Sequence, residues 1–85
     1  MPYKRYQARG ITFVFKYDDT DPSLLHIYAR HLTSPADAIR TFYEGSSTWN
    51  DDRGRFETYS ATHGLFWFWI EDEKVVMVIT CFTLA

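Results

Sequence analysis

The chain has 85 residues, of which 19% are aromatic and 24% are charged, and its formal net charge is −2. A chain of this length forms one domain with a small core, in which each aromatic side chain buries a large area. The charge balance excludes a strong overall basic field of the kind that draws proteins to nucleic acid or to membranes. The single cysteine, Cys81, excludes an internal disulfide and is typical of a reducing cytoplasm.

The N-terminus does not lead into a signal-peptide core, and no apolar run reaches the length of a membrane span. We therefore expect a single cytoplasmic domain over residues 1–85 that does not contact a membrane. No acidic residue precedes Asp18, whereas Lys4, Arg5 and Arg9 are basic. Lys4 and Arg5 are candidate contacts for an anionic partner, although most basic segments of this kind are only solvated.

A strand and two helices are predicted in the first half of the chain. Residues 11–17 alternate in the manner of a strand. Asp21-Pro22 is a helix start signal, and the helix that it predicts covers about residues 22–31. Ser34-Pro35 repeats the signal for a second helix that ends at Gly45. The residues that these two helices are expected to bury are Leu24, Leu25, Tyr28 and Ala29, then Ala36, Ile39, and Phe42 or Tyr43.

The second half of the chain is predicted to be mostly strand. A loop over residues 46–54 contains a short candidate strand at Thr48-Trp49, and residues 55–61 alternate again. Residues 65–82 then form two apolar runs around a charged connection, residues 71–74, which predicts a hairpin. The element order is β-α-α-(β)-β-β-β. The fold class expected is α+β, with two N-terminal helices packed on one face of an antiparallel meander.

The first strand of this hairpin is apolar on both faces. Leu65, Trp67 and Trp69 point to one side, and Phe66, Phe68 and Ile70 to the other. The helices account for one of these faces. The second face is therefore expected to contact a protein partner or a second copy of the chain, unless it is buried within the monomer.

Several short motifs resemble the BrnT and RelE type of small toxin and a related branch of unknown function. They are a His-x3-Arg pair at His26 and Arg30, the link over residues 31–35, Gly54-Arg55-Phe56, Gly64, and Val78-Ile79-Thr80-Cys81-Phe82. The resemblance implies a fold of the RelE-like (BECR) kind and a metal-independent endoribonuclease of a toxin–antitoxin pair, without a cofactor. The implied partners are an antitoxin-like protein and RNA.

Metal-independent RNA cleavage needs a general base, a general acid and a cation. His26 and Arg30, one turn apart, supply a group that titrates near neutrality and a permanent cation. Arg55 is a candidate phosphate clamp, Thr80 completes the proposed catalytic set, and Tyr59 is a candidate hydrogen-bond donor to substrate. From the residues alone, an ordinary solvated helix face is the better explanation of His26 and Arg30, and the resemblance brings the two interpretations close to equal.

The remaining candidates concern binding. Trp67 and Trp69 are candidates for stacking on unpaired bases, with core packing as the alternative. The three histidines have no spacing that predicts a metal site. The alternative to a ribonuclease is a non-catalytic interaction protein, such as a phage- or plasmid-borne inhibitor, and a homodimer is compatible with either function.

Overall fold

A computed structural model describes residues 3–84 as a single sheet of six strands with two short helices. The elements in chain order are β1 (Tyr3–Ala8), β2 (Ile11–Lys16), α1 (His26–His31), α2 (Pro35–Glu44), β3 (Ser46–Asn50), β4 (Arg55–Tyr59), β5 (His63–Ile70) and β6 (Val75–Thr83).

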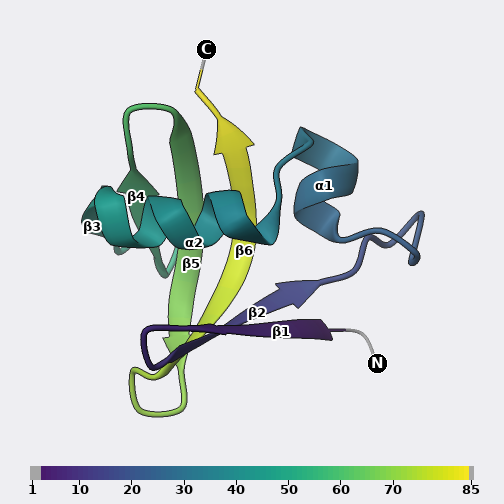
Figure 1. Ribbon diagram of the computed structural model, residues 1–85. Coiled ribbons are helices and arrows are strands. Elements are labelled where there is room, and N and C mark those ends of the chain that lie inside the picture. Colours follow the sequence, from purple (N-terminus) through teal and green to yellow (C-terminus); the bar gives the residue numbers. More distant parts are fainter. Residues whose placement is uncertain (1–2, 85) are drawn as a thin grey trace.

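The expected fold class, two N-terminal helices on an antiparallel meander, is wrong. The sheet is mixed, with the strand order β1-β2-β6-β5-β4-β3, and β2 pairs with β6 in parallel. Strands dominate the structure, and a hairpin of two strands precedes the helices (Figure 1). The antiparallel meander consists of β3, β4, β5 and β6. β1 and β2 form a separate antiparallel hairpin.

The strand β1 was missed because its side chains give little hydrophobic signal. All of its residues except Ala8 are exposed. Its pairing with β2 depends on the two-residue turn Arg9-Gly10, where both residues have a positive φ. Turns of this type match the twist of a hairpin, and glycine adopts the required backbone without strain. The segment expected to be a basic arm is therefore an edge strand.

The parallel pairing of β2 with β6 also escapes local reasoning. Phe13 lies opposite Val76 although the two residues are far apart in the chain. Nothing in the periodicity of either strand specifies which distant strand becomes its neighbour. The predicted hairpin of residues 65–82 is confirmed, because β5 and β6 pair antiparallel around the charged turn.

The helices differ in extent from the prediction. The first begins at His26 rather than Pro22, because residues after Asp18 form turns before the helix starts. Ile27 is its buried residue, while Tyr28 is 49% exposed. The second helix has the expected bounds and begins with a capping box between Ser34 and Asp37. It buries Ala38 and Thr41, and Ala36 is exposed.

The hydrophobic core lies between α2 and one face of the sheet (Figure 1). Residues of this helix-covered face from adjacent strands lie opposite one another in the register. The buried set is Phe13, Phe15, Ile27, Ala38, Leu65, Trp67, Val76, Val78 and Cys81. The helices thus cover the face that carries Leu65 and Trp67, as the alternation of residues 65–70 predicts.

The helix α1 lies beside the C-terminal half of β6, beyond the end of β2 (Figure 1). The Thr33 hydroxyl, in the link after α1, donates to the carbonyl oxygen of either Cys81 at 2.8 Å or Ile27 at 3.1 Å. This buried hydroxyl fixes α1 to the edge of β6. As a result, side chains of α1 reach the sheet face that no helix covers, which we call the open face.

Candidate functional site on the open face

The open face carries the residues that alternate with the core residues of each strand. Glu57, Phe66 and Thr80 lie side by side on β4, β5 and β6, and Tyr59, Gly64 and Phe82 form the next row. A β-carbon on Gly64 would stand 2.4 Å from the Phe82 ring, so the aromatic ring covers this glycine closely.

Two histidines of α1 extend the row that ends at Phe82. The ring of His31 lies 6.1 Å from the ring of Phe82, and the rings of His31 and His26 are 6.4 Å apart, edge to face. Phe82 in turn contacts Phe66 with a centroid distance of 5.1 Å, and Tyr59 at 6.3 Å. The histidines and the aromatic side chains therefore form one continuous surface.

Asp18, at the end of β2, anchors this surface. Its carboxylate is only 2% exposed and accepts hydrogen bonds from the Thr20 hydroxyl, from the backbone N–H groups of Thr20 and Asp21, and from Arg30 Nε at 3.0 Å. These donors, the Thr20 hydroxyl above all, hold the pKa of the Asp18 carboxyl well below its usual range. The residue remains an anion at any pH near neutrality.

His26 is the titratable group that faces this anion. Its Nδ1 lies 3.6 Å from Asp18 Oδ1, and its side chain is 23% exposed. Burial lowers the pKa of His26 below its ordinary value, and the nearby Lys16 cation lowers it further, against the opposite effect of Asp18. The imidazole is consequently neutral at pH 7 and able to accept a proton.

Arg55 lies at the far side of the open face. Its guanidinium is 3.9 Å from the centroid of the Phe66 ring and 2.9 Å from Glu57. Asn50 donates to the same carboxylate, and these two contacts lower the pKa of Glu57. A planar cation held over an aromatic ring in this way presents its remaining N–H groups in a fixed orientation.

Thr80 lies between these two ends of the surface. Its side chain is on the open face because its cross-strand neighbour is Phe66. The hydroxyl oxygen is buried and has no hydrogen-bond partner among the described residues. Since buried hydroxyl groups are normally paired, an unpartnered one at such a position requires an explanation.

The predicted catalytic residues thus fall into two groups on one face. His26 and Arg30 are held by Asp18 at one end, Arg55 is held by Phe66 and Glu57 at the other, and Thr80 lies on the strand between them.

Of the predicted binding residues, two lie on the open face and three on the opposite side. Tyr59 is 44% exposed in the row that ends at Phe82, and Arg5 lies opposite Val14 on β2. Lys4 points to the helix-covered side, where its ammonium lies 5.8 Å from the Tyr6 ring. The two tryptophans share that side and are described next.

Trp67 belongs to the core and is 3% exposed. It stacks on Phe56 at 4.6 Å, and its indole N–H donates to the Thr58 hydroxyl. Trp69 packs against Trp67 and the Phe42 ring of α2. Neither tryptophan shares a face with the histidines, so the core-packing interpretation describes their position.

The negative net charge does not fall on the open face. Seven of the eleven acidic residues are exposed on three turns. They are Asp19, Asp21, Asp51, Asp52, Glu71, Asp72 and Glu73. The open face itself carries Arg5, Lys16 and Arg55, with Glu57 paired to the last of these. The local charge of this face is therefore positive although the chain is acidic.

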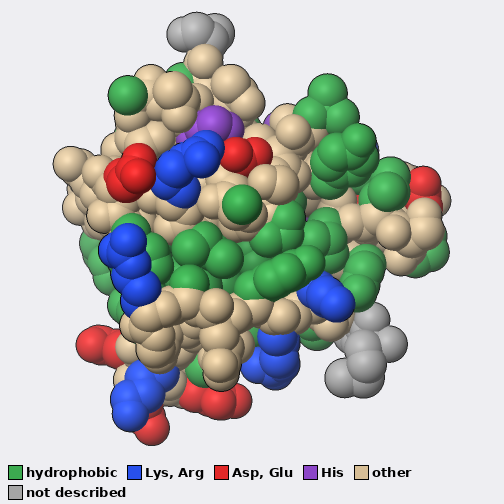
Figure 2. Space-filling view, viewed as in Figure 1, with side chains coloured by type: hydrophobic (Ala, Val, Ile, Leu, Met, Phe, Trp, Pro, Cys, Tyr) green, Lys and Arg blue, Asp and Glu red, His purple; other side chains and the backbone are tan. Residues whose placement is uncertain are grey.

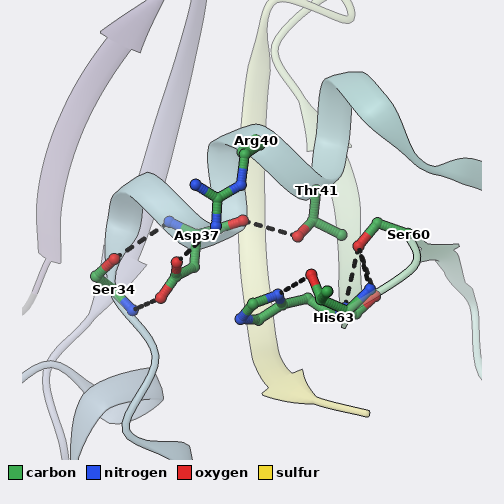
Figure 3. A network of polar contacts seen from close by, with 7 residues as sticks. Ser34, Asp37, Arg40, Thr41, Ser60 and His63 are labelled. Carbon is green, nitrogen blue, oxygen red and sulfur yellow. Dashed lines mark hydrogen bonds and ion pairs between the residues drawn. The ribbon is translucent and has the colours of Figure 1, made fainter.

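A second polar cluster lies on the helix-covered side, around the first turns of α2 (Figure 3). His63 Nδ1 is 2.7 Å from the Thr62 hydroxyl, and the ring points toward Asp37. The Asp37 carboxylate accepts from the Ser34 backbone N–H and pairs with Arg40, and its pKa is lowered chiefly by the Ser34 contact. These bonds cap the helix and close the turn before β5, so the cluster is structural.

The buried thiol of Cys81 is not a reactive nucleophile in this arrangement. Burial raises the pKa of the Cys81 thiol to about 11, so its thiolate is not formed near neutrality. Within residues 3–84, no three His, Cys, Asp or Glu side chains gather closely enough to hold a metal ion.

The same residues contain no helix long and apolar enough to cross a membrane.

Comparison of the chain with protein-family models, with curated proteins and with solved structures finds no match in any of the three. The resemblance to small toxins accordingly depends on the short motifs alone.

Sequence reasoning missed four members of the surface. Lys16 and His31 lie inside a predicted strand and a predicted helix whose patterns indicate no binding role, and Asp18 lies between these two elements. Phe82 entered only as the last residue of a motif. The alternation of β2 is the one pattern that could have indicated a member of this surface. Phe13 and Phe15 face the core, so Lys16 lies on the opposite face. The approach of His31 to Phe82 depends on how α1 docks, which no local pattern specifies.

Proposed function

We propose that this protein is a small metal-independent endoribonuclease whose substrate is a single RNA strand bound across the open face. The observation that carries the proposal is the continuous row Asp18, His26, His31 and Phe82, with Arg55 held over Phe66 beyond it. Aromatic rings stack on unpaired bases, and cations between them neutralise phosphates.

The reaction assigns one role to each histidine. The ribose 2′-oxygen attacks the adjacent phosphorus as His26, which is neutral, takes the hydroxyl proton. The bond from phosphorus to the 5′-oxygen breaks, and His31, as the general acid, supplies the proton that this oxygen needs. The products are a 2′,3′-cyclic phosphate and a 5′-hydroxyl, so the proton count balances. Regeneration requires a proton to return from His26 to His31 through solvent.

Asp18 has a positioning role in this scheme. If Nδ1 of His26 carries the proton, it faces the Asp18 anion and leaves Nε2 free as the acceptor; this tautomer is an assignment from the surroundings. Arg30 and Lys16 supply positive charge for the pentavalent phosphorane. The Thr80 hydroxyl has no partner among the described residues, but it is buried, so a phosphate oxygen would reach it only after the side chains above it move aside.

The test is cleavage of a labelled single-stranded RNA by the full chain in the presence of EDTA. We expect fragments that end in a cyclic phosphate. A matched RNA with 2′-deoxyribose at the cleaved position should remain intact, because it lacks the nucleophile. The proposal is wrong if the RNA is not cut, or if the deoxy-substituted strand is cut at the same rate.

A second candidate function, non-catalytic binding of a protein, is favoured by a different surface. Hydrophobic side chains form a band between α2 and the β1–β2 hairpin (Figure 2). A shallow groove in this region is lined by Ala8, Arg9, Ala36, Ile39, Arg40, Tyr43 and Glu44. This function would be preferred if the purified chain binds RNA weakly and cleaves none.

A further inference from the structure

The two edges of the sheet differ in how they are protected against pairing with another strand. An edge strand presents unpaired backbone N–H and C=O groups, and natural proteins block such edges with lysine, proline, bulges or a covering element. β1 carries Lys4 and Arg5. β3, at the opposite edge, contains no charged residue and no proline, and its residues Ser46–Trp49 are exposed.

Two side chains of β3 form hydrogen bonds back to β4 rather than across the outer edge of the sheet. The Ser47 hydroxyl is 2.6 Å from the Thr58 hydroxyl of β4, and the Asn50 amide donates to Glu57. Gly45 precedes the strand at a position with no room for a side chain. A β-carbon there would stand 2.8 Å from the backbone oxygens of both Thr41 and Tyr59. The Ser47 and Asn50 side chains are therefore directed back toward β4, and the start of the strand is closely packed.

We infer that β3 is a self-association edge, which pairs antiparallel with β3 of a second copy about a two-fold axis at Thr48. In this register Thr48 faces Thr48 of the second copy, Ser47 faces Trp49, and Ser46 faces Asn50. Every pair is neutral, so no like charges meet, and threonine pairs are favourable across strands. The two Trp49 rings, each 48% exposed, become diagonal neighbours on the helix-covered side.

The length of β3 limits the strength of this contact. Five residues per copy form an interface below the size of stable dimers, so the association should be weak and depend on concentration. The edge-to-edge dimer differs from a dimer in which the open faces of two sheets pack against each other. In that arrangement, Phe66 and Tyr59 would be covered and unavailable to a ligand.

The symmetry has one consequence that rests on the proposed function. A two-fold axis that relates antiparallel strands of one sheet stands perpendicular to that sheet. The open faces of both copies therefore lie on the same side and form a continuous surface. A dimer would present two sets of His26 and His31 to one RNA strand, whereas the association itself does not depend on cleavage.

The test is analytical ultracentrifugation of the full chain from about 1 μM to about 1 mM, the range that spans weak interfaces of this size. We expect a reversible shift from monomer to dimer. The Thr48→Lys and Thr48→Glu variants should each remain monomeric over the whole range, because like charges then meet on the axis. An equimolar mixture of the two variants should restore the dimer.

The matched control is Gln7→Lys on β1, an exposed substitution at the other edge that should leave the dimer unchanged. Circular dichroism of each variant checks that the fold is retained. The inference is overturned if the wild-type chain remains monomeric at the highest concentration, or if the dimer persists in the Thr48→Lys variant. Persistence would point to packing through another surface, such as the open face.

Discussion

The buried carboxylate of Asp18 pairs with the partly exposed imidazole of His26, with Asp18 Oδ1 3.6 Å from His26 Nδ1. The carboxylate is held by four further donor groups, including Arg30, so it is fixed before any ligand arrives. The pair is placed where β2 ends and α1 begins. It therefore joins the stability of this corner of the fold to the orientation of the proposed general base.

The Asp18→Asn substitution should lower both stability and cleavage. It retains the shape but removes the charge that Arg30 and the Thr20 contacts favour. We expect a lower melting temperature, and kcat reduced by about tenfold or more with a smaller change in KM, because the residue orients a group without touching RNA. A Thr20→Val variant, which removes one donor and keeps the anion, should be less affected in kcat. Equal losses in the two variants would contradict the positioning role.

Stability should also fall in acid because of Asp18. Its pKa is lower in the folded than in the unfolded chain, so the unfolded chain binds more protons as the pH falls. The contribution of Asp18 is present above about pH 4, the ordinary pKa of aspartate, and is lost progressively below it. Urea unfolding between pH 7 and pH 3 should show this loss in the wild-type chain and a shallower dependence in Asp18→Asn.

Lys16 should control the pH dependence of cleavage. Burial and Lys16 lower the pKa of His26, so the neutral, proton-accepting form persists below its ordinary pKa of about 6.5. Substitution Lys16→Gln removes one of these causes and raises the pKa. The acidic limb of the kcat/KM profile should then move to higher pH.

The control for this shift is Lys74→Gln, in the exposed turn between β5 and β6. It changes the net charge equally but should leave the limb in place. An acidic limb that does not move in Lys16→Gln would show that another group is the base.

Trp67 and Trp49 should differ sharply in their contributions to stability. Trp67 fills the core against Phe56 and Phe42, so Trp67→Ala should cost about 3–5 kcal/mol, as for other large-to-small core changes. Trp49 is 48% exposed, and Trp49→Ala should cost about 1 kcal/mol or less. Chemical denaturation measures both values. Similar costs would mean that the core assignment is wrong.

Gly64 provides a way to disturb the aromatic surface without removing any of its side chains. A β-carbon at this position would overlap the Phe82 ring, so Gly64→Ala should displace that ring from its seat between His31 and Phe66. RNA affinity should fall several-fold while the far-ultraviolet dichroism is retained. The double variant Gly64→Ala with Phe82→Leu relieves the overlap and should fold as well as Phe82→Leu alone.

The sequence predicts the parts of this fold that local patterns encode. The hairpin of residues 65–82, its two faces and the start of α2 follow from alternation and from Ser34-Pro35. The parallel pairing of β2 with β6 and the strand β1 do not follow. The first is a contact between distant segments, and the second has exposed polar residues that resemble a solvated arm.

The candidate site divides in the same way. The alternation of residues 55–61 correctly places Arg55 and Tyr59 on one face, and the helix spacing brings His26 near Arg30. The contact of His31 with Phe82 depends on the docking of α1 against the edge of β6. Because helix spacing places His26 and His31 on different faces, the sequence gives no reason to group them.

The central claim is that His26 and His31 together cleave RNA on the open face, and the most direct measurement is single-turnover cleavage by histidine variants. We predict that His26→Gln and His31→Gln each reduce the rate by at least about a hundredfold, the usual range for loss of a general base or acid. His63→Gln, which removes the histidine of the helix-covered side, should cleave at nearly the wild-type rate. Equal rates in all three variants, with the fold retained, would contradict the account.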